Sequence, residues 1–339
     1  MIGPDAGPAP GLPLVGWLGG WPVSILSLAL GVVVLFVFRR GLPHVGWIVG
    51  YLLLLWLVFV LATELRAPLL GRGKRLVLTA ADYTIQTLYH NLLLFVLPSY
   101  YGAATLDSPN IVFPVIVGAG ALVTAIDPWY RRIVHPRPGL NHVLLGFSIF
   151  AALNVALPLV GVRPILALEG SAVLAALALA PAFRREGISG WFRAHALAVA
   201  VALAALILVW YARVLVPPAP LFLARAVAAR TVTNMEPVDP ADGGVLPAAT
   251  VREWGELAAY TAVYAPAGVR QPIDHLWWRD GKQVAYVALP TPVMGGRRQG
   301  FRTYSRYTDF KAPVAGRYRV DVVTASGQLI GRLRFIVTP

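Results

Sequence analysis

Long apolar runs fill the first two thirds of the chain, and short runs of alternating polar and apolar residues fill the last third. A helix that crosses a bilayer needs about 20 mostly apolar residues, because each residue adds only about 1.5 Å of rise. Seven runs reach or approach that length and predict about seven transmembrane helices: Trp21 to Phe38, Val45 to Ala62, Tyr83 to Ser99, Ile111 to Ile126, Leu140 to Val160, Ile165 to Ala180 and Ala194 to Val214.

Beyond Pro217-Pro218 the apolar residues alternate with polar ones, which is typical of strands. Asp280-Gly281 and Ser326-Gly327 are residue pairs that tight hairpin turns favour. The predicted strands are Leu257 to Tyr264, Ile273 to Arg279, Gln283 to Leu289, Gly300 to Tyr307, Tyr318 to Thr324 and Leu329 to Val337, with Leu223 to Asn234 as an added edge strand. About seven short strands in this length predict an immunoglobulin-like β-sandwich.

The predicted fold class is therefore a membrane all-α helical bundle followed by an all-β, immunoglobulin-like sandwich domain. Its expected parts are a Gly/Pro-rich tail at 1–20, a transmembrane helical domain at 21–216 and a β domain at 217–339. The composition agrees, since 57% of the 339 residues are hydrophobic and only 13% are charged, which is too apolar for a soluble protein. The chain has no cysteine, which excludes disulfides, thiolate metal sites and cysteine nucleophiles.

Basic residues are concentrated in alternate short loops between the apolar runs. The loops after the second, fourth and sixth runs contain Arg66, Arg72, Lys74, Arg75, Arg131, Arg132, Arg137, Arg184, Arg185 and Arg193. Such loops stay in the cytoplasm, so we expect the β domain on the periplasmic side of a bacterial inner membrane. The formal charge of +13 thus reflects topology, and no nucleic-acid partner is predicted. Arg39 and Arg40 oppose this orientation: either the larger clusters outweigh them, or the first run does not fully cross.

Several segments of the β domain carry a family resemblance. They are His275 to Lys282, Gly300 to Ser305, Gly316 to Val320 and Gly327 to Val337. Together they resemble a bacterial domain of unknown function of the DUF2914 type, over the C-terminal part of the chain. Members of that family often follow a multi-pass membrane region, so the resemblance implies this architecture and no activity.

The third apolar run carries polar residues at helical spacing. Asp82, Gln86, Tyr89, His90 and Asn91 lie on one helical face, which we call the polar stripe. Because these residues are costly against lipid, the stripe should face other helices. It predicts either a functional feature, such as a proton relay, a ligand pocket, or pigment or haem ligation by His90, or hydrogen bonding between helices with Asp82 as the N-cap. No other cofactor and no metal are predicted.

The loop from Asp127 to Gly139 is basic, aromatic and rich in proline. Arg131, Arg132, His135 and Arg137 suit the binding of lipid phosphate at the cytoplasmic interface. The alternative is a membrane anchor that follows the positive-inside rule.

Arginine and tryptophan mark a candidate interaction surface on the β domain. Trp277 and Trp278 are consecutive in one strand, so one side chain should lie in the core and the other at the surface. His275 is the only histidine of this domain, and the sequence indicates no partner for it. The candidate surface for anionic partners comprises Trp278, Arg279, Arg297, Arg298, Arg302 and Arg306, with solvated strand faces as the alternative.

No complete catalytic constellation is legible, so no catalytic residue is assigned and a structural role is expected over an enzymatic one. The expected function is a non-catalytic accessory or scaffolding subunit of a larger membrane assembly, in a bioenergetic, photosynthetic, transport or envelope complex. The expected partners are membrane lipids and other membrane protein subunits. Two alternatives stay open: a lipid- or glycan-handling transporter or enzyme, and a membrane sensor with an extracytoplasmic ligand-binding domain.

Overall fold

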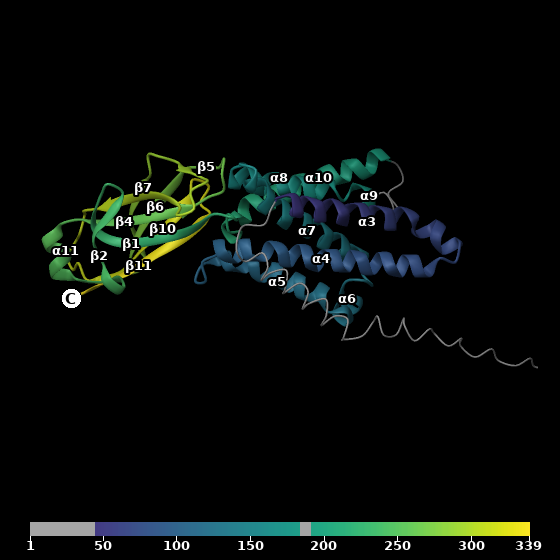
Figure 1. Cartoon of the computed structure of the whole chain (residues 1–339), viewed down its shortest axis with the longest axis horizontal. Helices are drawn as coiled ribbons and strands as arrows, with labels where there is room; N and C mark the ends of the chain where they lie inside the picture. Colours follow the sequence, from purple (N-terminus) through teal and green to yellow (C-terminus); the bar gives the residue numbers. More distant parts are fainter. Residues whose placement is uncertain (1–44, 184–190) are drawn as a thin grey trace, which may run out of the picture.

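The protein consists of a helical bundle and a β domain placed end to end (Figure 1). The structure is a computed structural model that describes residues 45–183 and 191–339. The predicted tail 1–20, the predicted helix Trp21 to Phe38, and Arg39, Arg40, Arg184 and Arg185 lie outside the described residues. The helices are α3 (Val45–Gly71), α4 (Arg75–Ala103), η1 (Pro109–Ile111), α5 (Val112–Ala125), α6 (Asp127–Ile133), α7 (Pro138–Leu159), α8 (Pro164–Leu177), α9 (Ala180–Phe183), α10 (Trp191–Ala212) and η2 (Arg213–Leu215).

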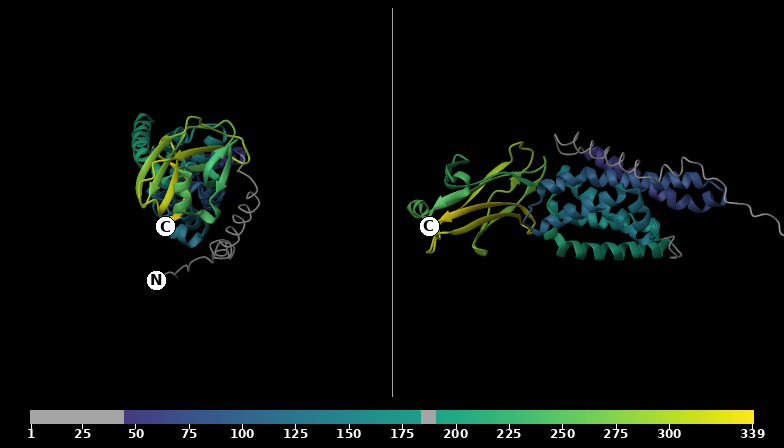
Figure 2. Two further views of the ribbon diagram at one scale, coloured as in Figure 1. Left: turned by 90° about the vertical axis from the view of Figure 1, so that its left-hand side faces the viewer. Right: turned by 90° about the horizontal axis from the view of Figure 1, so that it is seen from below.

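The long helices run back and forth along one axis, with α4 packed against α3, α5 and α7, and α8 packed against α7 and α10 (Figures 1 and 2). Leucine and aromatic side chains such as Leu92, Tyr100, Leu145 and Leu168 fill the interior of this bundle. α10, in contrast, leaves most of its surface uncovered by the rest of the described chain, as expected for a helix that faces lipid.

Several helices are long and apolar enough to cross a membrane. Among the described residues there are four such stretches, Gly46–Arg66, Pro138–Leu159, Pro164–Phe183 and Phe192–Leu215, or up to five if the bent pair Pro109–Ala125 and Asp127–Ile133 is one span. α4 does not belong to this set although it has 29 residues, because the polar stripe lowers its hydropathy. The described part of the chain thus contains several membrane-length helices.

The helix that carries the polar stripe begins earlier than the sequence pattern predicts. α4 starts at Arg75 rather than Tyr83, because Gly73 adopts a left-handed conformation (φ 69°) that ends α3 and lets the chain enter the next helix at once. Asp82 consequently lies about two turns inside α4. The prediction that Asp82 is the N-cap was wrong.

The chain bends sharply where α5 meets α6. The two helices differ in direction by 101° because Ile126 between them is extended, and Pro128 then occupies the first turn of α6, where no N–H is needed. The segment from Asp127, predicted as a loop, therefore begins as a short helix that crosses the end of the bundle.

The β domain is built from two larger sheets and one small one (Figure 1). A four-stranded sheet has the order β2-β1-β4-β9, a five-stranded sheet has the order β3-β11-β10-β6-β7, and β5 pairs with β8. The strands are β1 (Phe222–Thr233), β2 (Glu236–Pro240), β3 (Val245–Pro247), β4 (Leu257–Tyr264), β5 (Arg270–Gln271), β6 (Ile273–Arg279), β7 (Lys282–Ala288), β8 (Val293–Met294), β9 (Phe301–Tyr307), β10 (Gly316–Thr324) and β11 (Leu329–Thr338), with the helix α11 (Ala248–Trp254) between β3 and β4.

A shared hydrophobic core joins the two larger sheets. Trp277 of β6 is fully buried, stacks on Tyr307 of β9 at 5.4 Å between ring centroids, and meets Phe335 of β11 edge-on. The next residue, Trp278, lies on the opposite face of the strand, as expected for a pleated chain. This tryptophan core connects β6, β9 and β11, which are far apart in the sequence.

Most predicted strands agree with the structure, but the place of the first one was wrong. β1 is not an edge strand, because it pairs with both β2 and β4; the short segment β2, which the sequence pattern missed, covers its other side. The Asp280-Gly281 turn has the two positive φ angles, 47° and 81°, that a type I′ hairpin requires.

Loops of the helical bundle bind the β domain directly. Asp107, in the loop between α4 and α5, accepts a hydrogen bond from Arg332 Nη1 at 2.7 Å and also pairs with Arg334. Arg332 in turn donates to both carboxylate oxygens of Asp321 on the adjacent strand, at 2.5 and 3.2 Å. The Asp321 and Arg332 side chains are both 9% exposed, so this pair is largely shielded from water, whereas Asp107 and Arg334 are about half exposed.

Neighbouring contacts complete this junction. Fully buried Asn110 donates to the carbonyl oxygen of Leu329, Gln328 donates to that of Val216, and Arg213 donates to that of Ser326. On the loop between α7 and α8, the backbone of Gly161 lies so close to Gly268 that a Cβ atom on Gly268 would stand 3.3 Å from the Gly161 Cα. Separate loops of the bundle therefore hold the β domain at several points.

We predict that Arg332→Met destabilises the protein far more than Arg334→Met, although both arginines contact Asp107. Removing Arg332 takes away the bidentate partner of the buried Asp321 carboxylate and should lower the free energy of unfolding by about 3 kcal/mol. Arg334 is half-exposed, so its loss should cost less than about 1 kcal/mol. Denaturant unfolding of the full chain in mild detergent measures both; equal losses would contradict the assigned role of Arg332.

Candidate functional site

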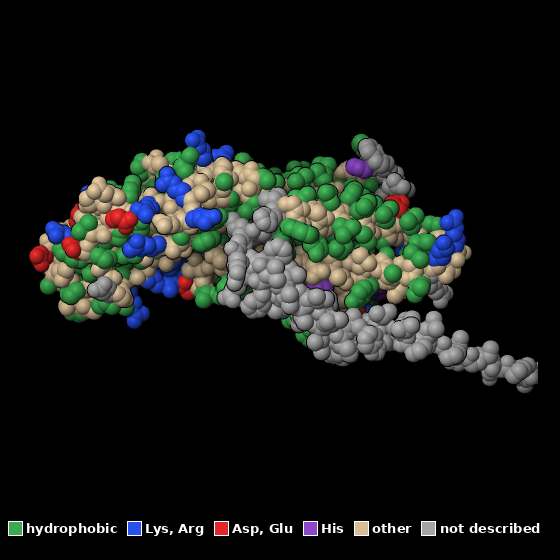
Figure 3. Space-filling model, viewed as in Figure 1, with side chains coloured by type: hydrophobic (Ala, Val, Ile, Leu, Met, Phe, Trp, Pro, Cys, Tyr) green, Lys and Arg blue, Asp and Glu red, His purple; other side chains and the backbone are tan. Residues whose placement is uncertain are grey.

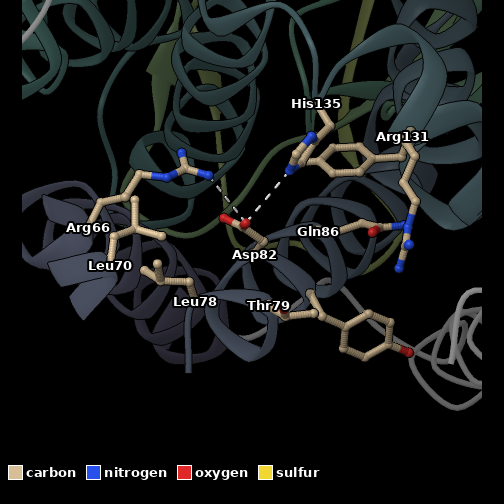
Figure 4. Close-up of a pocket in the computed structure, with 10 residues that line it drawn as sticks. Arg66, Leu70, Leu78, Thr79, Asp82, Gln86, Arg131 and His135 are labelled. Atoms are coloured by element: carbon tan, nitrogen blue, oxygen red, sulfur yellow. Dashed lines mark ion pairs between the residues drawn. The ribbon is translucent and has the colours of Figure 1, made fainter. Parts of the chain in front are cut away.

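A pocket of about 440 Å³ lies at the end of the bundle away from the β domain, between α3, α4 and α6 (Figure 4). It brings together the polar stripe of α4 and the basic segment after α5, two candidates that lie about 50 residues apart in the sequence. The pocket is lined by Arg66, Leu70, Leu78, Thr79, Asp82, Tyr83, Gln86, Tyr130, Arg131 and His135. A smaller adjoining pocket shares Arg66, Leu78, Asp82, Tyr130 and His135 with it.

Asp82 is the centre of this pocket. Its Oδ2 atom lies 3.6 Å from Arg66 Nη2 and 3.6 Å from His135 Nε2 (Figure 4). Both separations are longer than hydrogen bonds. All three side chains are between one third and just over one half exposed, so water and small polar groups can reach them. The site therefore holds one carboxylate, one guanidinium and one imidazole within reach of a single ligand.

The rest of the polar stripe turns into the bundle. Gln86 donates from Nε2 to the carbonyl oxygen of Thr124 at 3.0 Å, and the Tyr89 hydroxyl bonds Asn141 Oδ1 at 3.3 Å. His90 is buried, and Asn91 is half-buried. The stripe is thus divided: Asp82 and Gln86 reach the pocket, whereas Tyr89 and His90 lie among packed helices.

The basic segment is divided in a similar way. Arg131 donates from Nε to Asp127 Oδ1 at 3.1 Å, one turn earlier on α6. Arg137 binds the carbonyl oxygens of Arg132 and Ile133 and so caps the C-terminal end of α6. Arg132 is exposed. Only His135 and Arg131 of the predicted set line the pocket.

No group of three or more His, Asp or Glu side chains suited to a metal ion occurs among the described residues. Pigment or haem ligation by His90 stays a prediction. His142, on α7, lies edge-on to Phe59 with 6.0 Å between ring centroids.

On the β domain the predicted surface falls on two different sheets. Trp278 and Arg279 belong to β6 of the five-stranded sheet, where Arg319 covers the Trp278 ring at 4.4 Å. Arg279 is only 16% exposed and donates to the carbonyl oxygens of Lys311, Pro313 and Ala315. Arg279 therefore holds the loop before β10 in place, and its part in an interaction surface stays a prediction.

The four-stranded sheet carries the remaining arginines on its outer side. Arg306 lies 5.5 Å from the Tyr304 ring, Arg225 of β1 lies 5.6 Å from the Tyr260 ring, and Arg302 bonds Glu236 Oε1 at 2.5 Å. We call Arg225, Tyr260, Arg302, Tyr304 and Arg306 the arginine–tyrosine face. Arg297 and Arg298 line a shallow depression at its edge, next to Phe301.

Sequence reasoning missed the partners of His275. Trp277 donates from Nε1 to Ser305 Oγ at 2.9 Å, so the Ser305 hydroxyl proton can be directed to His275 Nδ1, 2.8 Å away. This assignment places the imidazole proton on Nε2, which lies 3.2 Å from Thr261 Oγ1. His275 is fully buried. Ser305 and His275 therefore belong to a hydrogen-bond network in the core, which a substrate cannot reach. Their spacing in the sequence does not indicate this contact, because it forms only when the two sheets pack together.

The family comparisons divide the chain into two matched regions. Residues 19–258 match a family of unknown function, DUF5924. The chain belongs to the DUF5924 family. Residues 270–337 match a second family of proteins of unknown function, DUF2914, which confirms the resemblance found in the β domain. No curated protein matches this DUF5924 chain.

The two matches do not meet at the boundary between bundle and β domain. The DUF5924 match continues through β1, β2 and β3 and ends at Ala258, near the start of β4. The pocket and Arg225 thus lie in the DUF5924 region, whereas His275, Arg302 and Arg306 lie in the DUF2914 region. The arginine–tyrosine face is built from both.

We predict that the DUF5924 chain loses stability in acid because of His275. Burial lowers the pKa of His275 to about 4 from its usual 6.5, so between these values the unfolded chain binds a proton that the folded chain does not. The free energy of unfolding should be highest above pH 6.5 and should fall by about 3 kcal/mol as the pH drops to 4. His275→Gln should remove most of this slope in unfolding titrations of the full chain. An unchanged slope in folded His275→Gln would contradict the assignment.

Proposed function

We propose that this chain is a non-catalytic accessory or scaffolding subunit of a larger assembly in the bacterial inner membrane. Its helices would dock against other membrane proteins, and its β domain would present a binding surface in the periplasm. The junction around Asp107, Arg332 and Asp321 is the observation that carries this proposal. A domain tied to its bundle at several points is suited to holding a partner at a fixed position, whereas a domain on a linker would not be.

The distribution of basic residues supports the proposed sidedness. Arg72 and Lys74 lie in the turn between α3 and α4, and Arg131, Arg132 and Arg137 follow α5, all at the end of the bundle opposite the β domain (Figure 1). The side of the bundle between this end and the β domain is covered mostly by hydrophobic side chains (Figure 3). This pattern is typical of a protein whose basic end stays in the cytoplasm.

We further infer about seven transmembrane helices and an immunoglobulin-like arrangement of strands. The bundle would use α3, α4, α5, α7, α8 and α10 together with the predicted helix Trp21 to Phe38; α4 can take part because its polar side chains Gln86, Tyr89 and His90 are buried against its neighbours. In the described β domain, the strands β1, β4 and β9 oppose β6, β7, β10 and β11. A division of seven antiparallel strands into two packed sheets supports the immunoglobulin-like prediction.

The arginine–tyrosine face is the proposed docking surface for an acidic region of a neighbouring subunit. The guanidinium groups of Arg225 and Arg306 lie over tyrosine rings, which holds them in place while their N–H groups stay able to bind carboxylates. Glu236 is the acidic side chain that contacts both Arg225 and Arg302. An acidic partner could replace it in these pairs.

We predict that a photo-reactive phenylalanine analogue in place of Tyr304 forms a cross-link to a membrane protein partner in intact cells. Arg306→Glu should reduce the yield about tenfold or more, because like charges at an interface cost over 1 kcal/mol. The same charge change at exposed Arg317, on β10 of the other sheet, should leave the yield unchanged.

Two outcomes would contradict the scaffolding proposal. One is a chain that migrates alone after gentle detergent extraction and gives no adduct from Tyr304. The other is an adduct whose yield falls equally with Arg306→Glu and Arg317→Glu, since that result would reflect overall charge rather than the arginine–tyrosine face.

We predict opposite labelling of the two ends of the protein by a membrane-impermeant maleimide. The chain has no cysteine, so the maleimide can react only with the cysteine that is introduced. Lys311→Cys, at an exposed position of the β domain, should react in intact spheroplasts. Arg72→Cys, in the turn between α3 and α4, should react only after the membrane is permeabilised. The reverse pattern would place the β domain in the cytoplasm and remove the periplasmic docking role.

A further inference from the structure

The pocket around Asp82 adjoins a helix that would lie along the membrane interface. α6 turns by 101° from the direction of α5 and so runs across the end of the bundle. Trp129 and Ile133 on α6 are exposed, and tryptophan prefers the membrane interface. Leu70 on the pocket wall and Leu76 and Val77 in the first turn of α4 are also exposed, which provides apolar surface at the same end of the bundle as the charged groups. A ligand with a polar head and apolar chains would satisfy both parts.

The two arginines of the pocket have N–H groups able to bind a phosphate. Arg66 is 55% exposed and stands 3.6 Å from Asp82, beyond hydrogen-bond distance. Arg131 is equally exposed and uses Nε for Asp127, so its terminal nitrogens can donate to a ligand. Guanidinium groups bind phosphate oxygens in pairs of parallel hydrogen bonds. The imidazole of His135 adds a further polar group to the same wall.

The carboxylate of Asp82 distinguishes this pocket from a simple anion site. A purely anionic headgroup would bind Arg66 and Arg131 but would offer the Asp82 carboxylate only a repelling negative charge. A headgroup that also carries a primary ammonium would give that carboxylate three N–H donors. The charges of the described pocket residues agree with this choice, because the guanidinium groups of Arg66 and Arg131 line the same pocket as the carboxylate of Asp82, so a phosphate and an ammonium would each meet an opposite charge.

We propose that this pocket binds the headgroup of a phospholipid that carries both a phosphodiester and a primary ammonium, as phosphatidylethanolamine does. The phosphate binds between Arg66, Arg131 and His135, the ammonium binds Asp82, and the acyl chains follow the apolar surface beside Leu70. This site is independent of the arginine–tyrosine face on the β domain.

The test uses the full chain, delipidated in mild detergent and placed in nanodiscs with equal amounts of phosphatidylethanolamine and phosphatidylglycerol. Native mass spectrometry then counts the lipids that stay bound on release. We expect about tenfold more phosphatidylethanolamine than phosphatidylglycerol, as the loss of one charge-assisted hydrogen bond would imply. Asp82→Asn should abolish this preference, whereas Asp82→Glu should keep it. The double variant Arg66→Gln and Arg131→Gln should lower the retention of both lipids.

Arg72→Gln is the matched control, because Arg72 lies at the same end of the bundle but does not line the pocket. It should keep the preference, and thermal unfolding of every variant separates lost binding from lost folding. Phosphatidylcholine, whose ammonium has no N–H, should be retained no better than phosphatidylglycerol. Equal retention of all lipids by the wild type, a preference that survives in folded Asp82→Asn, or displacement of the lipid by millimolar inorganic phosphate alone would each overturn the proposal.

Discussion

The buried ion pair between Asp321 and Arg332, together with the bond from Arg332 to Asp107 of the bundle, is the set of contacts on which the arrangement of bundle and β domain depends. Both side chains are nearly buried, and a buried charge is tolerated only when it is paired and hydrogen-bonded. Asp107, from a loop of the bundle, supplies the further carboxylate that Arg332 requires. The two parts of the molecule therefore complete each other's charge balance. Asn110 and Gln328 also join the two parts, since each side chain donates a hydrogen bond across the junction to a backbone carbonyl oxygen.

Sequence patterns predicted those features that depend on neighbouring residues. The predicted bounds of β4 and β6 agree with the structure at both ends, because turn-forming residues such as Gly255, Pro272 and Gly281 flank the two runs. The start of α4 was predicted too late, since the turn at Gly73 is decided by backbone conformation rather than by hydropathy. The pocket could not be predicted as one site, because it forms only when the bend after α5 brings His135 beside Asp82. The partners of His275 were hidden for the same reason: they come from two other strands.

The polar residues of α4 show how one helix can serve two environments. Toward the middle of the bundle, Gln86 and Tyr89 satisfy their polar groups on neighbouring helices, which removes the cost of facing lipid. Asp82 lies nearer the helix start, where the half-exposed Arg66 and His135 surround it. The polar residues in the middle of α4 thus form hydrogen bonds between helices, whereas Asp82 near its start forms a charged site that solvent can reach.

The end of the DUF5924 match near the start of β4 bears on how this architecture can be inherited. β1 belongs to the DUF5924 region and lies beside β4 in the same sheet as β9, which belongs to the DUF2914 region. A DUF2914 region passed on without β1 and β4 would expose the edge of β9 that pairs with β4, and unpaired edges invite aggregation. The two regions therefore have to be inherited together. A recombination point that preserves the fold would lie before β1, and not at the border between the two family matches.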